Sequence, residues 1–160
     1  MSGRPDRRGR AFNVGPSPGL VLPAIFRGEH PPSSTAPLPP MCPSAAENRP
    51  AVFLDRDGTL VEDVGWVRSP DQLHWYADTV RALRLLRDRF VFFLVTNQVG
   101  VARGELTLEE MDRVHRHLVD ELARQGVPIR AVYACPHDRG AGCACAKPSP
   151  HFLERAAVEH

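Results

Sequence analysis

The chain has 160 residues, which is room for one domain of ordinary size. Its formal net charge is +1, so no global field favours binding to nucleic acid or to a membrane surface. No run approaches the roughly 20 apolar residues that a membrane span requires, and a soluble, cytoplasmic protein is therefore expected.

The first third of the chain is rich in proline. Residues 1–50 hold 11 of the 16 prolines and show no sustained apolar period. Such a segment cannot bury enough surface to offset the entropy of ordering it. We therefore predict that residues 1–48 are disordered and that residues 49–160 form the folded domain. Proline interrupts the apolar patch at residues 19–26, which disfavours an export signal, and translation from Met41 is an alternative account of this segment.

The run from Val52 to Leu60 carries two carboxylates, one residue apart, from an apolar segment into a glycine turn. A parallel strand needs a continuous apolar run because both its faces are covered, and ligands of such sheets lie just beyond the strands' carboxyl ends. Asp55 would occupy that position, and Asp57 would project to the same side of the extended chain. Gly58 and Thr59 let the backbone turn and approach a phosphate. This arrangement is typical of a nucleophile for phosphoryl transfer; the alternative is a strand that ends in an ordinary Asx turn.

Helices and strands alternate after this first strand. In chain order, the pattern first predicts a loop at residues 65–71, a helix from the cap Asp78 to about Asp88, and a strand at 90–95. A second helix begins with a capping box formed by Thr107 and Glu110 and ends at Gly126. A strand at 129–134 and a helix that begins near His151, after Pro150, complete the pattern. Alternating strands and helices predict an α/β fold with a parallel, doubly wound sheet and right-handed crossovers. His115 and His117 fall within the second helix, where we expect ordinary surface or boundary residues and not ligands.

Three of the four cysteines lie in one short segment, in which Cys135 and His137 precede a five-residue spacer that is followed by Cys143 and Cys145. Thiolate and imidazole ligands paired at both ends of a short loop suit tetrahedral zinc. Disulfides are disfavoured because three clustered cysteines leave one over, and a chance cluster of thiols is the remaining alternative. Four protein ligands leave no open position, so this zinc would be structural and would fold a loop that has little apolar content.

Together these motifs resemble one branch of the haloacid dehalogenase-like (HAD) superfamily: the capless, zinc-containing heptose-bisphosphate phosphatases and the related histidinol-phosphate phosphatases. The resemblance covers about residues 50–160. It implies a HAD-like Rossmannoid parallel sheet with helices on both faces and strand order 3-2-1-4-5. It also implies a phosphomonoester hydrolase in which Asp55 attacks phosphorus and forms an aspartyl-phosphate, while Asp57 serves as the general acid and base. Mg²⁺ would be held by the Asp55 carboxylate and the Asp57 carbonyl.

The resemblance further assigns residues that contact the substrate. Thr96 would contact the phosphoryl oxygens, Asn97 and Gln98 would lie beside the substrate, and Lys147 would neutralise the transferred group. The loop residues expected at the substrate are Asp63, Gly65, Trp66 and Arg103. The partner is thus a small phosphorylated metabolite, first D-glycero-D-manno-heptose 1,7-bisphosphate and second histidinol phosphate.

The chain departs from the family pattern at four points. Val99 stands in place of a serine, Trp66 in place of a usual tyrosine, and Ala146 in place of an arginine that helps to bind the second phosphate of heptose bisphosphates. Losing that bidentate donor weakens the bisphosphate assignment.

The fourth departure is that the chain stops at His160, before the family's fourth strand and its Gly-Asp-x-x-x-Asp motif. We therefore expect a sheet that is incomplete at the C-terminus, with the Asp55 strand as an exposed edge, and weak activity or none. With that segment present, a monomer is expected. Two hypotheses remain open: a Mg²⁺-dependent phosphatase, and an inactive remnant that binds zinc.

Overall fold

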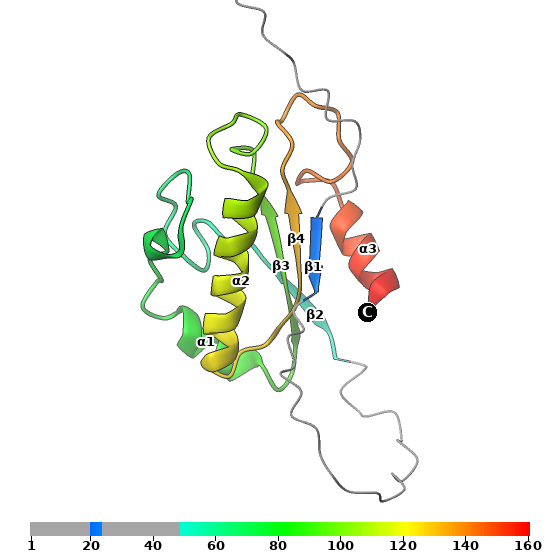
Figure 1. The fold of residues 1–160 in the computed structure, drawn as a ribbon. Coiled ribbons are helices and arrows are strands. Elements are labelled where there is room, and N and C mark those ends of the chain that lie inside the picture. The colour runs from blue at the N-terminus through cyan, green and yellow to red at the C-terminus, as the bar shows by residue number, and fades with distance from the viewer. Residues whose placement is uncertain (1–19, 24–48) are drawn as a thin grey trace, which may run out of the picture.

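The computed structural model describes residues 20–23 and 49–160, and these contain a four-stranded sheet (Figure 1). Its strands are β1 (Leu20–Pro23), β2 (Ala51–Leu54), β3 (Val91–Asn97) and β4 (Ile129–Cys135), in the order β1-β4-β3-β2. Strands β2, β3 and β4 are parallel; Phe53 lies opposite Phe93, and Val95 lies opposite Tyr133. The predicted parallel α/β sheet is confirmed.

Strand β1 differs from the expected disorder. Its backbone pairs antiparallel with β4, with Leu20 opposite Ala134 and Pro23 opposite Ala131. An extended segment can pair with an exposed sheet edge through main-chain hydrogen bonds alone. Because such pairing does not depend on the pattern of side chains, the sequence does not indicate it. The other residues of the expected disordered segment, 1–19 and 24–48, lie outside the described residues.

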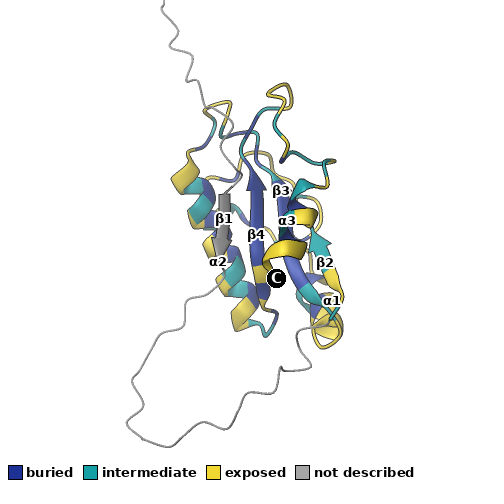
Figure 2. Ribbon diagram, turned by 90° about the vertical axis from the view of Figure 1, so that its right-hand side faces the viewer, coloured by how far each residue is buried: buried dark blue, intermediate teal, exposed yellow. Residues whose placement is uncertain are grey.

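Helices cover both faces of the sheet, as predicted. Helices α1 (Thr79–Leu86) and α2 (Leu108–Arg124) lie on one face and α3 (His151–Glu159) on the other (Figures 1 and 2). Successive residues of a strand point to opposite faces, so β3 packs Phe92 and Leu94 toward α2 and Phe93 toward α3. Figure 2 shows β3 and β4 buried between these layers, whereas β2 is only partly buried. Among the described residues, no helix is long and apolar enough to cross a membrane.

The two predicted helix caps behave differently. Thr107 Oγ1 accepts a hydrogen bond from Glu110 N at 3.1 Å, and Glu110 Oε2 accepts one from Thr107 N at 2.6 Å, so the capping box of α2 is formed. Asp78 is the residue before α1, but its side chain accepts from Arg81 Nε at 3.1 Å and caps no backbone amide. The guanidinium three residues on competes successfully for this exposed carboxylate.

Strand β2 pairs only with β3 and forms one edge of the described sheet, as expected. A cavity of about 460 Å³ lies along this edge beneath α3, and its lining includes Phe53, Phe93 and His160. Because Ala51 and Val91, the first residues of β2 and β3, also line it, the cavity lies toward the amino ends of the strands. The carboxyl ends of the strands, where Asp55 follows β2, lie at the opposite end of the sheet.

Gly100 is a point of close approach between two loops at the carboxyl ends of the strands. A Cβ added there would overlap Leu106 Cδ2 and lie 2.8 Å from Trp66 Cε3. We expect Gly100→Ala to lower the free energy of unfolding by about 1–3 kcal/mol, the usual cost of overpacking. Gly140→Ala is the matched control, because nothing lies within 4 Å of a Cβ at that position. Urea unfolding measures both, and equal midpoints would contradict the packing of Trp66 on Gly100.

Candidate active site and metal site

Asp55 follows β2 directly and lies beside Lys147, a residue 92 positions further along the chain. Asp55 Oδ2 is 2.5 Å from Lys147 Nζ, which also donates to the Val95 carbonyl oxygen at 3.0 Å. Asp55 Oδ1 accepts from Arg56 N at 2.8 Å. The Asp55 side chain is nevertheless 43% exposed. An accessible carboxylate with a cation at its side suits attack on a phosphoryl group, whose charge the ammonium would share.

Asn97 holds the backbone of Lys147 in place. Its Oδ1 accepts from Lys147 N at 3.0 Å, and its Nδ2 donates to Lys147 O at 3.3 Å. The family resemblance placed Asn97 beside the substrate. In the structure, both ends of its amide instead connect the end of β3 to the segment that carries Lys147.

Asp57 belongs to a hydrogen-bonded network that the sequence analysis missed. Arg56 Nε and Nη2 donate to Asp57 Oδ1 and Oδ2, both at 2.9 Å. Gln98 Nε2 donates to Asp57 Oδ2 at 3.0 Å and to Thr96 Oγ1 at 2.9 Å. Thr96 and Gln98, predicted at the substrate, are both buried. The position of Arg56 in the sequence could have indicated this network, because a guanidinium at the end of a buried strand needs hydrogen-bond acceptors.

His115 corrects the expectation of an ordinary surface or boundary residue. It is fully buried, and its Nε2 lies 3.1 Å from Arg56 Nη1. Burial, with the Arg56 charge as a second cause, lowers the pKa of His115 to about 3. His117 is exposed on the same helix, as expected.

The remaining predicted substrate residues lie in two loops. Asp63 Oδ1 accepts from Gly65 N at 3.1 Å, and Gly65 has a φ of +84°, a conformation that favours glycine. Trp66 is 39% exposed and packs on Gly100. Arg103 forms an exposed ion pair with Asp138 at 3.0 Å. The structure thus brings Thr96, Asn97, Gln98 and Lys147 together with the aspartates, whereas the described contacts of these four loop residues are with other loop residues.

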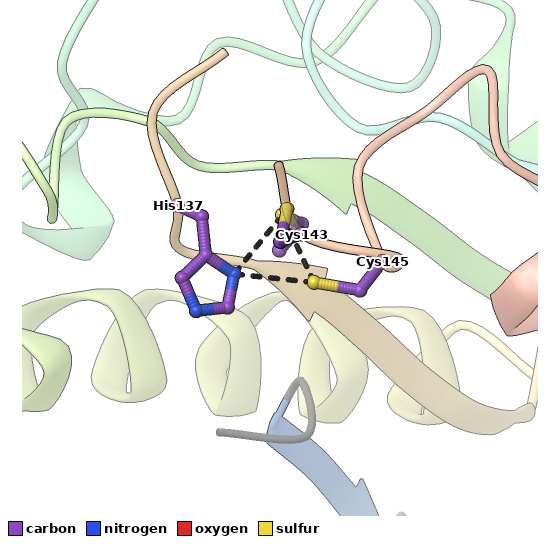
Figure 3. Close-up of side chains that lie close together, drawn as sticks. His137, Cys143 and Cys145 are labelled. Carbon is purple, nitrogen blue, oxygen red and sulfur yellow. Dashed lines mark hydrogen bonds between the residues drawn. The ribbon is translucent and has the colours of Figure 1, made fainter. Parts of the chain in front are cut away.

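The predicted zinc ligands converge in a cluster at the end of β4 (Figure 3). Their ligand atoms all lie within 4.8 Å of one another. His137 Nδ1 is 3.2 Å from Cys145 Sγ and 3.6 Å from Cys135 Sγ, and Cys135 Sγ is 3.6 Å from Cys143 Sγ. Zinc bonds of about 2.0–2.3 Å would place the ligand atoms of a tetrahedral site roughly 3.3–3.8 Å apart. The donor set and its spacing therefore fit a zinc ion.

Asp55 and Asp57 offer oxygen donors of the kind that Mg²⁺ prefers. The Asp55 carboxylate is partly exposed, and the main-chain carbonyl of Asp57 follows two residues later. Mg²⁺ commonly takes one or two carboxylates and completes its shell with water and substrate phosphate. The Asp55 carboxylate and the Asp57 carbonyl are hard donors of this kind and fit Mg²⁺.

The chain matches no protein-family model, but it has clear relatives. A D-glycero-β-D-manno-heptose-1,7-bisphosphate 7-phosphatase of Pasteurella multocida is 38% identical over 116 residues, which cover 68% of this chain and 63% of the relative. A protein of Thermoplasma volcanium, assigned as a D-glycero-D-manno-heptose-1,7-bisphosphate 7-phosphatase, is 38% identical over 110 residues, or 68% of this chain and 75% of the relative. The solved D,D-heptose 1,7-bisphosphate phosphatase from B. bronchiseptica, complexed with magnesium and phosphate, matches at 33% identity with a TM-score of 0.63, over 69% of this chain and 63% of that one.

The parallel α/β fold matches the solved structures of a heptose bisphosphate phosphatase and of a HAD-like phosphatase from Mesorhizobium loti, at 33% and 30% identity, so the domain has the HAD-like phosphatase fold. Within that class, the chain belongs to the heptose-1,7-bisphosphate 7-phosphatase family. It spans 66% of the length of the relative from Thermoplasma acidophilum and 55% of the relative from Mycobacterium tuberculosis.

Proposed function

We propose that this chain hydrolyses phosphomonoesters through an aspartyl-phosphate, and that its first substrate is D-glycero-D-manno-heptose 1,7-bisphosphate, from which it removes the 7-phosphate. The observation that carries the proposal is the partly exposed Asp55 carboxylate 2.5 Å from Lys147 Nζ at the end of a parallel strand. The names of the relatives support the substrate.

The residues divide the reaction into two displacements. First, an Asp55 oxygen forms a bond to phosphorus, the bond to the leaving oxygen breaks, and that oxygen takes a proton from Asp57. Second, a water molecule gives a proton back to Asp57 and attacks the aspartyl-phosphate, which releases inorganic phosphate and restores Asp55. Lys147 Nζ, held by the Val95 carbonyl at 3.0 Å, would stabilise the charge on the phosphoryl oxygens in both steps. Mg²⁺ bound by the Asp55 carboxylate and the Asp57 carbonyl would add further charge stabilisation and orient the phosphate.

Histidinol phosphate is the second candidate substrate. Ala146 precedes Lys147 and carries no guanidinium for a second phosphate. Without this bidentate donor, the site binds a second phosphate less tightly than a site with the family's arginine would, and a substrate with one phosphate is therefore favoured.

Zinc is proposed as a structural ion held by Cys135, His137, Cys143 and Cys145. Lys147 lies two residues beyond Cys145, so ordering this loop would also set the position of the catalytic ammonium. The described cysteines form no disulfide, which suits the reducing cytoplasm, where we propose that the protein acts.

Phosphate release by the purified full chain tests the proposed function. The assay compares heptose 1,7-bisphosphate, histidinol phosphate and 4-nitrophenyl phosphate, each with and without added Mg²⁺. We expect Mg²⁺-dependent release, fastest with the heptose bisphosphate. Faster release from histidinol phosphate would favour the second candidate. No release from any substrate would favour the inactive zinc-binding remnant.

A further inference from the structure

Arg56 is a buried cation at the centre of the active-site network. It is 0% exposed, although it lies between two aspartates that are both partly open to solvent. Nε and Nη2 form a bidentate pair with the Asp57 carboxylate, and Nη2 also donates to Gln98 Oε1 at 3.0 Å. A fully buried guanidinium is costly unless its N–H groups find acceptors, so the acceptors around it determine its orientation.

The remaining nitrogen of Arg56, Nη1, is directed to His115 on α2. A guanidinium only donates hydrogen bonds, so His115 Nε2, 3.1 Å away, must be the acceptor and must carry no proton. The ring proton then lies on Nδ1, a buried atom that has no partner among the described residues. The ring must therefore be neutral, which agrees with the lowering of the pKa of His115 by burial and by Arg56.

The Asp57 carboxylate is held on nearly all sides. A carboxylate has about four acceptor positions, and here Oδ2 accepts from Arg56 Nη2 and Gln98 Nε2 while Oδ1 accepts from Arg56 Nε. One acceptor position on Oδ1 is left. The Asp57 side chain is 20% exposed, and the free position on Oδ1 is the one left for a substrate or a water molecule.

We propose that Arg56, oriented by neutral His115, is a positioning residue that fixes the Asp57 carboxylate so that Oδ1 exchanges the proton with the leaving group and the attacking water. This inference rests on the proposed function. Neither residue touches substrate; each acts through Asp57. A general acid contributes only when it lies within hydrogen-bonding distance of the leaving oxygen, and small misplacements are costly.

The choice of leaving group tests the inference. Departure of a sugar alkoxide requires a proton, whereas 4-nitrophenolate leaves without one. The measured quantity is the kcat/KM for the heptose bisphosphate divided by that for 4-nitrophenyl phosphate. It reports on expulsion of the leaving group and not on hydrolysis of the intermediate. The fraction of folded enzyme cancels in this ratio, so partial unfolding of a variant does not affect it.

We expect Arg56→Met and His115→Leu to lower this ratio by about 10-fold or more, a part of the 10²- to 10⁴-fold effect of general acid catalysis. His115→Gln places an amide near the position of Nε2 and should retain the ratio within about threefold, because one acceptor is restored. His117→Leu, on the exposed side of the same helix, should leave it unchanged. Equal losses on both substrates, or no rescue by His115→Gln, would overturn the inference.

NMR spectroscopy of the full chain, prepared with Zn²⁺ and Mg²⁺, separates this inference from the proposed function. The ¹⁵N signals of His115 should show a protonated Nδ1 and an unprotonated Nε2 at pH 7, and the Nε2 signal should move in Arg56→Met. The Asp57 carboxyl ¹³C signal should move in His115→Leu and not in His117→Leu. A protonated Nε2, or an unmoved Asp57 signal, would overturn the positioning role. If the wild-type chain turns over no substrate, the proposed function fails, and these signals still decide the arrangement.

Discussion

Asp55→Asn should lower phosphate release by at least about 10⁴-fold, the scale on which loss of a covalent nucleophile is felt in other enzymes. The amide is a poor nucleophile, and it also removes the negative charge that lies 2.5 Å from Lys147 Nζ. An aspartyl-phosphate is an acyl phosphate, which survives an acid quench and is hydrolysed in alkali. The check is therefore an acid-quench measurement of labelled aspartyl-phosphate together with steady-state turnover. Both signals should vanish in the variant.

Asp88→Asn provides the control for a lost carboxylate. Its side chain is 89% exposed and lies 3.8 Å from Arg87, near the end of α1. Turnover by this variant should equal that of the wild-type chain. Circular dichroism should show that both variants are folded, since Asp55 is also partly exposed. If Asp55→Asn retained turnover within tenfold of the wild-type rate, another residue would be the nucleophile.

Loss of the zinc ion should unfold the loop from Cys135 to Lys147. This loop has few apolar residues to bury, so most of its folding free energy must come from the metal, and structural zinc supplies about 10–16 kcal/mol in small zinc-binding peptides. We expect one zinc per wild-type chain and much less in Cys143→Ser, with a lower melting temperature. Turnover should also fall, because Lys147 would lose its position beside Asp55. Metal analysis and thermal unfolding measure these effects.

The same substitution at Cys42 is the control, because this residue lies outside the segment that holds Cys135, His137, Cys143 and Cys145. Cys42→Ser should retain one zinc per chain. Zinc release should increase as the pH falls, since thiolate and neutral imidazole ligands must lose their protons to bind the metal, and protons therefore compete with zinc for the cluster. Zinc content that is unaffected by Cys143→Ser would exclude the proposed site.

Local chemistry was enough to predict most of the elements and the separate motifs. The apolar run before Asp55 predicts β2, because a strand covered on both faces needs such a run. Thr107 and Glu110 predict the start of α2, because their capping box involves only neighbouring residues. The cysteine and histidine cluster was visible for the same reason: its members lie within 11 consecutive residues, on the two ends of one loop.

Contacts between distant residues were decided by the tertiary structure alone. His115 lies 59 residues from Arg56 in the sequence. Its burial depends on which face of α2 packs on the sheet and on where along the strands the helix lies. Asn97 and Lys147 are 50 residues apart, and they meet because parallel strands bring the carboxyl ends of β3 and β4 together. The sequence alone therefore determined strands β2, β3 and β4, the helices, the two aspartates and the cysteine–histidine segment, since each depends on neighbouring residues. The antiparallel pairing of β1 with β4 joins residues more than 100 positions apart, and only the tertiary structure shows it. The partners of Asp55, Asp57 and Asn97 depend on packing between elements, which no local pattern specifies.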